Sequence, residues 1–219
     1  FNLDPSDKIV AQFHEWMTGT GLLYLKSANV PIATVFTTHA TVIGRCIAGN
    51  NLPLYDGILS YNADEKARQF NVVARHSLEK KAAQNSDIFT TVSEITAQEC
   101  RQFLGRPVDV VTPNGFEPSF TPATDEEYIV LRDKARQRLV TVASAMCGEE
   151  VPENAVLVGI GGRYEWKNKG IDVFIDALDK LNHTEFEGKC VHAFIMIPSG
   201  HNGPDKQLIS KLAGNPSGY

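Results

Sequence analysis

The sequence lacks features that mark several large classes of protein. It has no Cys-x-x-Cys pair, and its four cysteines, at 46, 100, 147 and 190, are far apart. It has no run of lysine and arginine long enough for a nucleic-acid groove, and its formal net charge is −5. No apolar stretch reaches the ~18 residues of a membrane span. We therefore expect free thiols in a reducing, cytoplasmic compartment, and neither a nucleic-acid nor a membrane partner.

Common catalytic and nucleotide-binding motifs are also missing. His14-Glu15 begins a zinc motif, but Thr18 stands where His-Glu-x-x-His needs its second histidine. Neither Gly-x-Ser-x-Gly nor Gly-x-x-x-x-Gly-Lys-Ser/Thr occurs. Gly159-x-Gly161 begins a dinucleotide fingerprint, but Tyr164 stands at the position of the third glycine. These absences argue against a zinc enzyme, a serine hydrolase, a Walker-type NTPase and a Rossmann oxidoreductase.

What the sequence does contain is an alternation of apolar, β-branched segments with helical patterns. It predicts strands at 9–13, 31–38, 87–93, 108–112, 155–160 and 191–197. It predicts helices at 16–27, 95–104, 125–145 and 171–178, and one or two helices at 64–85. This rhythm with short links is typical of an α/β fold with parallel sheets.

A break at 116–153, which opens with the two prolines Pro118 and Pro122, divides this pattern. We expect an amino-terminal domain at 1–118, an interdomain helical segment at 119–153 and a second domain that begins at 154 and runs to 219. The second domain has too few strands to be stable alone. The chain also begins with Phe1 rather than methionine, so we expect that both domains are incomplete.

Polar residues follow several predicted strands, and ligands of open parallel sheets bind beyond the carboxyl ends of strands. Glu15 and His39 follow the first two strands. Arg163 and Lys169 flank the glycine-rich turn GGRYEWKNKG at 161–170, just before a predicted helix. Backbone N–H groups and the helix dipole favour an anion there, and arginine and lysine suit a diphosphate. The alternative is that Arg163, Lys167 and Lys169 are solvated and pair with Glu165.

Five motifs together resemble one known family. They are QFHEW at 12–16, FTTHATVIGR at 36–45, DIFTTVSEIT at 87–96, PNG at 113–115 and GRYEWKNKG at 162–170. They are similar to the glycogen synthases of the animal and fungal type, glycosyltransferase family 3, and the resemblance extends over about residues 9–198.

The resemblance implies a GT-B fold, in which two Rossmann-like domains face each other across a cleft. Residues 1–118 would form the acceptor side and 154–219 the start of the nucleotide-sugar donor side. The family transfers glucose from UDP-glucose to the non-reducing end of an α-1,4-glucan, glycogen, with retention of configuration and with no metal or cofactor. By resemblance, His39 would sit against the donor sugar, and Glu15 would line the same cleft. Arg45 would contact the donor or its phosphate, and Arg163 and Lys169 would hold the diphosphate.

Several alternatives stay open at this point. Retention is explained by front-face attack, in which the departing phosphate takes the acceptor's proton, or by Glu15 as the stabilising acid. The donor is UDP-glucose or, in a starch-synthase-like enzyme, ADP-glucose. A non-catalytic glucan-binding half-domain is the alternative of a different class. We expect this chain alone to be inactive because part of the family's site lies outside it, and assembly into a homo-oligomer is left open.

Overall fold

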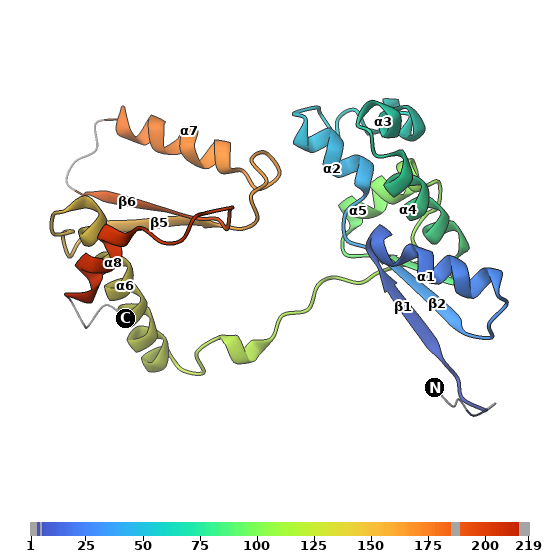
Figure 1. Ribbon diagram of the computed structural model, residues 1–219, viewed down its shortest axis with the longest axis horizontal. Helices are drawn as coiled ribbons and strands as arrows, with labels where there is room; N and C mark the ends of the chain where they lie inside the picture. The colour runs from blue at the N-terminus through green and yellow to red at the C-terminus, as the bar shows by residue number, and fades with distance from the viewer. Residues whose placement is uncertain (1–3, 5, 185–188, 215–219) are drawn as a thin grey trace. The chain divides into compact units, whose positions relative to one another are not determined.

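The computed structural model describes residues 4, 6–184 and 189–214 and divides the chain into two compact units, residues 1–115 and 116–219 (Figure 1). The segment 119–153 belongs to the second unit. Every strand pair in the described residues is parallel, which confirms the predicted α/β class with parallel sheets.

The first unit contains a four-stranded sheet in the order β1-β2-β3-β4. Its strands are β1 (Val10–His14), β2 (Ala33–Thr38), β3 (Ile88–Thr91) and β4 (Val110–Val111). Its helices are α1 (Glu15–Ser27), α2 (Val42–Gly49), α3 (Ala63–Gln69), α4 (Val73–Asn85) and α5 (Glu94–Glu99), which continues into a π-helical turn, Cys100–Leu104.

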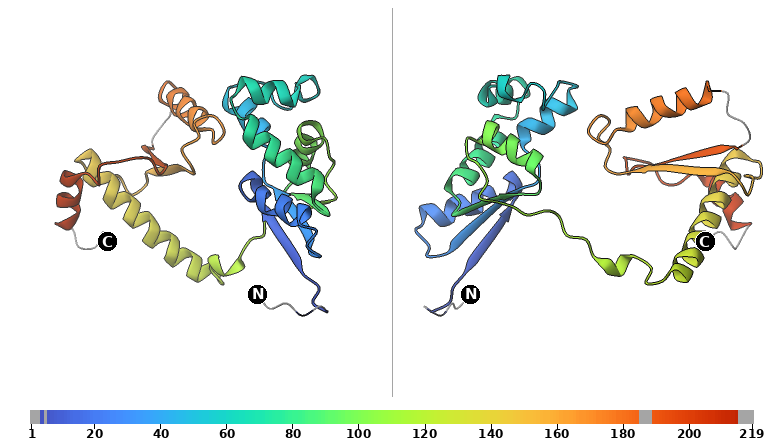
Figure 2. Two further views of the ribbon diagram at one scale, coloured as in Figure 1. Left: turned by 45° about the vertical axis from the view of Figure 1, so that its right-hand side comes forward. Right: turned by 180° about the vertical axis from the view of Figure 1, so that it is seen from behind.

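A row of aromatic rings across the sheet forms the centre of the first unit's core. Phe13 pairs with Phe36, and Phe36 pairs with Phe89, so the three rings lie side by side on one face. Helices α1 and α4 pack against each other (Figure 2) and cover this row through Leu22 and Ala82. Burial of each large apolar side chain stabilises the fold by about 1.5–3 kcal/mol.

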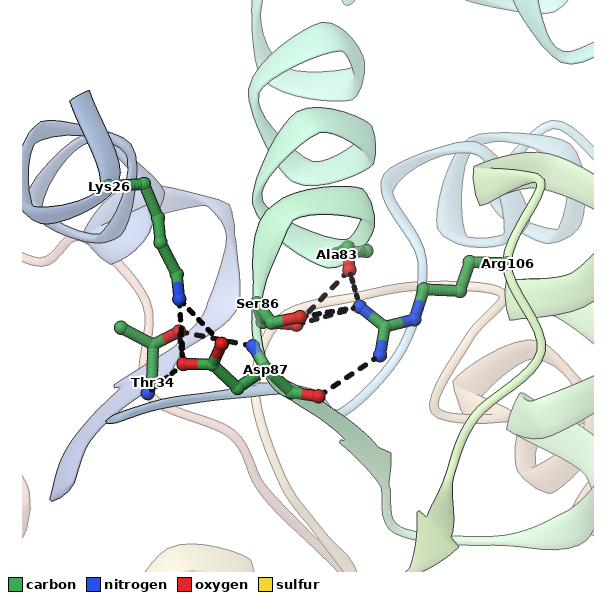
Figure 3. Close-up of polar contacts among 6 residues, drawn as sticks. All are labelled: Lys26, Thr34, Ala83, Ser86, Asp87 and Arg106. Atoms are coloured by element: carbon green, nitrogen blue, oxygen red, sulfur yellow. Dashed lines mark hydrogen bonds and ion pairs between the residues drawn. The ribbon is translucent and has the colours of Figure 1, made fainter. Parts of the chain in front are cut away.

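The amino ends of the strands are joined by polar contacts (Figure 3) among Lys26, Thr34, Ala83, Ser86, Asp87 and Arg106. The Lys26 ammonium donates to both carboxylate oxygens of Asp87 at 2.6 Å, and the backbone N–H of Thr34 donates to Oδ2 at 2.7 Å. These donors lower the pKa of Asp87 to about 2. Arg106 Nη1 donates to the carbonyls of Ala83 and Ser86 at 2.6 and 2.8 Å. The contacts therefore join α1, α4 and the starts of β2 and β3.

The second unit contains a two-stranded sheet, three α-helices and a short 3-10 helix, Pro118–Phe120, in its described part. The strands are β5 (Val156–Gly161) and β6 (Val191–Met196), and the helices are α6 (Asp125–Cys147), α7 (Ile171–Asn182) and α8 (Lys206–Ala213). Its cluster of buried apolar residues consists of Ala143, Val151 and Ala155, with Val140 and Phe194 packed against it.

Two helices depart from the sequence expectation. Helix α2 follows β2 directly, and Thr41 caps it by accepting a hydrogen bond from the Gly44 N–H. Helix α8 lies beyond the last predicted strand, where the sequence predicts no helix, and the Asp205 carboxylate caps it by accepting from the N–H groups of Gln207 and Leu208. Ser93 caps α5, because its hydroxyl accepts from the Thr96 N–H at 3.2 Å.

All four cysteines are free, and Cys100 is buried. None of the helices in the described part of the chain combines the length and the apolarity that crossing a bilayer requires.

Candidate active site

Three polar residues meet at the carboxyl ends of β1 and β2 in the first unit. The backbone N–H of His39 donates to Glu15 Oε1 at 3.0 Å, and Nδ1 of His14 lies 3.1 Å from Nε2 of His39. The parallel register of β1 and β2 brings them together. His14 pairs with Thr37, so both strands end at the same edge of the sheet. Glu15 and His39 are half-buried, so their side chains remain accessible.

The backbone of Glu15 is strained. Its φ is 62°, a left-handed conformation that residues other than glycine seldom adopt. Such a conformation costs on the order of 1–3 kcal/mol and is found most often where function requires it. The strained turn places the Glu15 carboxylate within hydrogen-bond distance of the His39 N–H. This contact fixes the start of the segment that joins β2 to α2.

The two imidazoles are hydrogen-bonded to each other through one nitrogen each. Nδ1 of His14 and Nε2 of His39 form this bond, in which one nitrogen donates and the other accepts. His39 Nδ1 has no hydrogen-bond partner among the described residues. It is therefore the ring atom that is left to contact a ligand.

Arg45 lies in the first turns of α2, close in sequence to His39. Its side chain is half-buried, and its guanidinium has no ion-pair or hydrogen-bond partner within the residues that the structure covers. A cation without a carboxylate partner is suited to bind an anionic ligand.

Two buried glutamates that the sequence did not reveal support the same segment. Glu79 of α4 accepts from the Thr38 hydroxyl at 2.8 Å and from the Val42 N–H at 3.0 Å. Glu99 of α5 accepts from the Thr41 hydroxyl at 2.7 Å. Burial raises the pKa of Glu79 to about 7, against the effect of its two donors. The only signal in the sequence was the helical spacing of Glu79 with His76 and the alanines at 82 and 83, which all lie on the buried face of α4.

A second group of charges lies on the turn before α7. Arg163 pairs with Glu165 at 2.8 Å, and Lys167 pairs with Asp172 at 2.7 Å. Lys169 is exposed and forms no ion pair in the described part of the chain. The predicted pairing with Glu165 is therefore realised for Arg163 only.

The backbone of this turn differs from an open anion cradle. The N–H groups of Lys169, Gly170 and Ile171 donate to carbonyls at Glu165, Lys167 and Trp166, so they are already satisfied. Gly170 has a φ of 66°, which lets the chain enter α7 in a left-handed turn. These three amides are therefore not available to an anion, whereas the Lys169 side chain is unpaired among the described residues and Arg163 is held by Glu165 alone.

The structure thus brings Glu15 and His39 into contact and places Arg163 and Lys169 on one turn. The first pair belongs to one unit and the second to the other. Within residues 4, 6–184 and 189–214, no group of three His, Cys, Asp or Glu side chains is arranged to hold a metal ion.

Comparisons with known proteins match most of the chain, across both units. The family model described as glycogen synthase matches residues 2–209. The glycogen [starch] synthase of Dictyostelium discoideum is 37% identical over 209 residues, 91% of this chain and 23% of that protein. Isoform 2 of Saccharomyces cerevisiae is 36% identical over 92% of this chain and 29% of its own length, and the human liver enzyme 39% identical over 80% and 25%. The chain therefore spans about a quarter of the length of these curated relatives.

Among solved structures, the chain is similar to the catalytic domain of starch synthase IV from Arabidopsis thaliana bound to ADP and acarbose. The identity is 17% and the TM-score 0.47, over 94% of this chain and 44% of that one.

Proposed function

Because the chain belongs to the glycogen synthase family, we propose that it forms part of a retaining glucosyltransferase that moves glucose from UDP-glucose to the non-reducing end of an α-1,4-glucan. The observation that carries this proposal is the contact between Glu15 and His39 at the carboxyl ends of β1 and β2. Ligands of parallel α/β sheets bind at this edge. Family membership and the names of the relatives support the glucan product, and UDP as the nucleotide is our choice over ADP.

His39 and Glu15 act on the donor sugar in this proposal. His39 Nδ1 hydrogen-bonds to the sugar, while Nε2 stays bonded to His14. Glu15 Oε1 is engaged by the His39 N–H, so we assign Glu15 to orienting His39 and stabilising positive charge on the sugar rather than to nucleophilic attack. The acceptor's proton then passes to the departing phosphate. Loss of one preorganised group of this kind typically costs about 10²–10³ in turnover.

Arg45, Arg163 and Lys169 bind the phosphates of the donor. When the glycosidic bond breaks, negative charge grows on the nucleoside diphosphate, and fixed cations stabilise that charge. We propose that these three side chains supply that stabilisation and that no metal ion is required. The exposed Arg163 can exchange Glu165 for a phosphate because a surface ion pair contributes only about 0–1 kcal/mol.

The test is glucosyl transfer by the full-length protein that contains these residues. We expect UDP-glucose to be used in preference to ADP-glucose, and Arg163→Ala to lower turnover about 10²–10³-fold with an unchanged unfolding temperature. Lys167→Ala is the matched control because Lys167 is paired with Asp172, and its turnover should stay within about threefold. A preference for ADP-glucose would make the protein starch-synthase-like, and an Arg163→Ala effect on stability alone would make the cluster structural.

The 219-residue chain alone should not transfer glucose, because its curated relatives are about four times longer. Turnover comparable to that of the full-length protein would contradict this expectation. Glucan binding measured with and without UDP tests the non-catalytic alternative, which predicts glucan binding that is indifferent to UDP. A cytoplasmic location and a homo-oligomer stay predictions.

A further inference from the structure

The segment between β2 and α2 is held by an unusual number of carboxylates. Over five consecutive residues, Thr38 to Val42, four residues donate hydrogen bonds to a glutamate. Thr38 and Val42 donate to Glu79, His39 donates to Glu15, and Thr41 donates to Glu99 through its hydroxyl and, at 3.3 Å, its N–H. We call this segment, residues 38–42, the His39 segment.

The three acceptors come from three different helices. Glu15 begins α1, Glu79 lies in the middle of α4, and Glu99 ends α5. The position of the His39 segment is thus fixed by the packing of three helices and not by its own turn alone. Glu79 and Glu99 are buried, at 0% and 4% exposure, so solvent does not compete for these bonds.

These buried carboxylates have neutral partners only. Within the described residues, neither Glu79 nor Glu99 forms an ion pair, and the remaining bond of Glu99 comes from the Tyr55 hydroxyl at 2.9 Å. Burying a carboxylate without a cation is unfavourable, and well-packed apolar side chains at such positions are often at least as stable. The arrangement is therefore explained better by what it positions than by stability.

We propose that Glu79 and Glu99 are positioning residues that hold the His39 segment, and with it His39 and the first turns of α2 that carry Arg45, in the geometry required for glucosyl transfer. The proposal rests on the proposed function of His39 and extends it to two residues that do not touch substrate. A displacement of about 1 Å at a reacting group can cost on the order of 10² in rate. Loss of the hydrogen bonds that Glu79 and Glu99 accept, which tether the His39 segment to α4 and α5, should therefore lower kcat more than it raises KM.

Paired substitutions separate positioning from packing. Glu79→Gln retains an acceptor for the Val42 N–H and an amide that can donate to the Thr38 hydroxyl, whereas Glu79→Met keeps the volume but accepts neither bond. In the full-length protein, we expect kcat within about threefold of wild type for Glu79→Gln and a loss of about 10–10² for Glu79→Met, with little change in KM. The pair Glu99→Gln and Glu99→Met should behave in the same way.

Thr38→Val is the milder variant should Glu79→Met not fold, because it removes only the hydroxyl donor. We expect it to lower kcat in the same direction. Equal kcat per folded molecule for wild type, Glu79→Met and Thr38→Val would overturn the proposal.

Hydrogen exchange in the 219-residue chain tests the tether without any activity. The Val42 amide should exchange at least tenfold faster in Glu79→Met than in Glu79→Gln, while amides of β3 are unchanged. Equal Val42 exchange in the two variants would contradict the tether itself. An inactive full-length wild type with the predicted exchange difference would instead locate the failure in the proposed function.

Discussion

The two ends of the four-stranded sheet use carboxylates in opposite ways. At the amino end, Asp87 is half-exposed and bound to the Lys26 ammonium, and its pKa is lowered to about 2. At the carboxyl end, Glu79 is fully buried with only neutral donors, and its pKa is raised to about 7. The amino end therefore favours the charged form of its carboxylate, while the carboxyl end disfavours it.

The difference separates a stabilising end from a functional one. At the amino end, the contacts of Asp87 with Lys26 and Thr34 join α1 to the starts of the strands, and the charge of the carboxylate is matched by that of the ammonium. The carboxyl end contains buried carboxylates and a left-handed Glu15, all of which cost stability. Such costs are typical of sites that hold reacting groups in place.

The largest stability effect that we expect comes from the ionisation of Glu79. The pKa of Glu79 in the folded protein, about 7, lies above its ordinary value of 4.5. The stability that protonation of Glu79 contributes is therefore fully present below pH 4.5 and is lost as the pH rises through 7. The loss is on the order of 3 kcal/mol in the free energy of unfolding. Glu79→Gln should flatten this pH dependence.

Urea unfolding of the chain as a function of pH measures this dependence of the unfolding free energy on the ionisation of Glu79. One tryptophan lies in each unit, so a Trp166→Phe background lets Trp16 report the first unit alone. A decline between pH 4.5 and 7 that persists unchanged in Glu79→Gln would show that another group is responsible.

Gly44→Ala should disturb the carboxyl end by sterics alone. A Cβ at Gly44 would overlap Glu99 Oε2 and come within 2.8 Å of Thr41 Oγ1. Overpacking of this kind costs about 1–3 kcal/mol of unfolding free energy. Gly200→Ala is the control because a Cβ there meets nothing within 4 Å, and equal stability of the two variants would refute the close packing around Glu99.

Asp87→Asn should have the smallest effect, about 1 kcal/mol, because the pair with Lys26 is half-exposed and screened by solvent. Since its pKa is lowered, this contribution is present above pH 3.8 and is lost as the pH falls toward 2. Unfolding at pH 7 and pH 2 tests the sign. The control is Asp133→Asn, in an exposed pair with Arg132, which should change stability by less than about 0.5 kcal/mol. An effect as large as that of Asp87→Asn would show that the amino-end contacts stabilise the fold no more than an ordinary surface pair.

The sequence predicted much of the sheet and the long helices, because apolar β-branched runs and helical periodicity are local signals. It missed α2, whose sequence VIGRCIAG has two glycines and three β-branched residues that weaken a helix prediction. It missed α8 because this helix is only eight residues long and follows a glycine and a proline, so the spacing of Leu208 and Leu212 is a weak signal.

The candidate site was predictable in part for the same reason. The order of parallel strands brings residues that follow consecutive strands to one edge, so the meeting of Glu15 and His39 could be anticipated. Glu79 and Glu99 could not, because each lies in a helix that reads as polar, and their partners are 37 to 58 residues away in the sequence. Burial of a charged residue follows from tertiary packing, which no local pattern encodes.

The most direct test of the difference between the two ends is the kcat for glucosyl transfer from UDP-glucose by the full-length protein, measured for His39→Ala and Asp87→Asn. We expect a loss of about 10²–10³ for His39→Ala and a value within about twofold of wild type for Asp87→Asn. Equal turnover of the two variants, at any level, would contradict the assignment of the carboxyl end as the functional one.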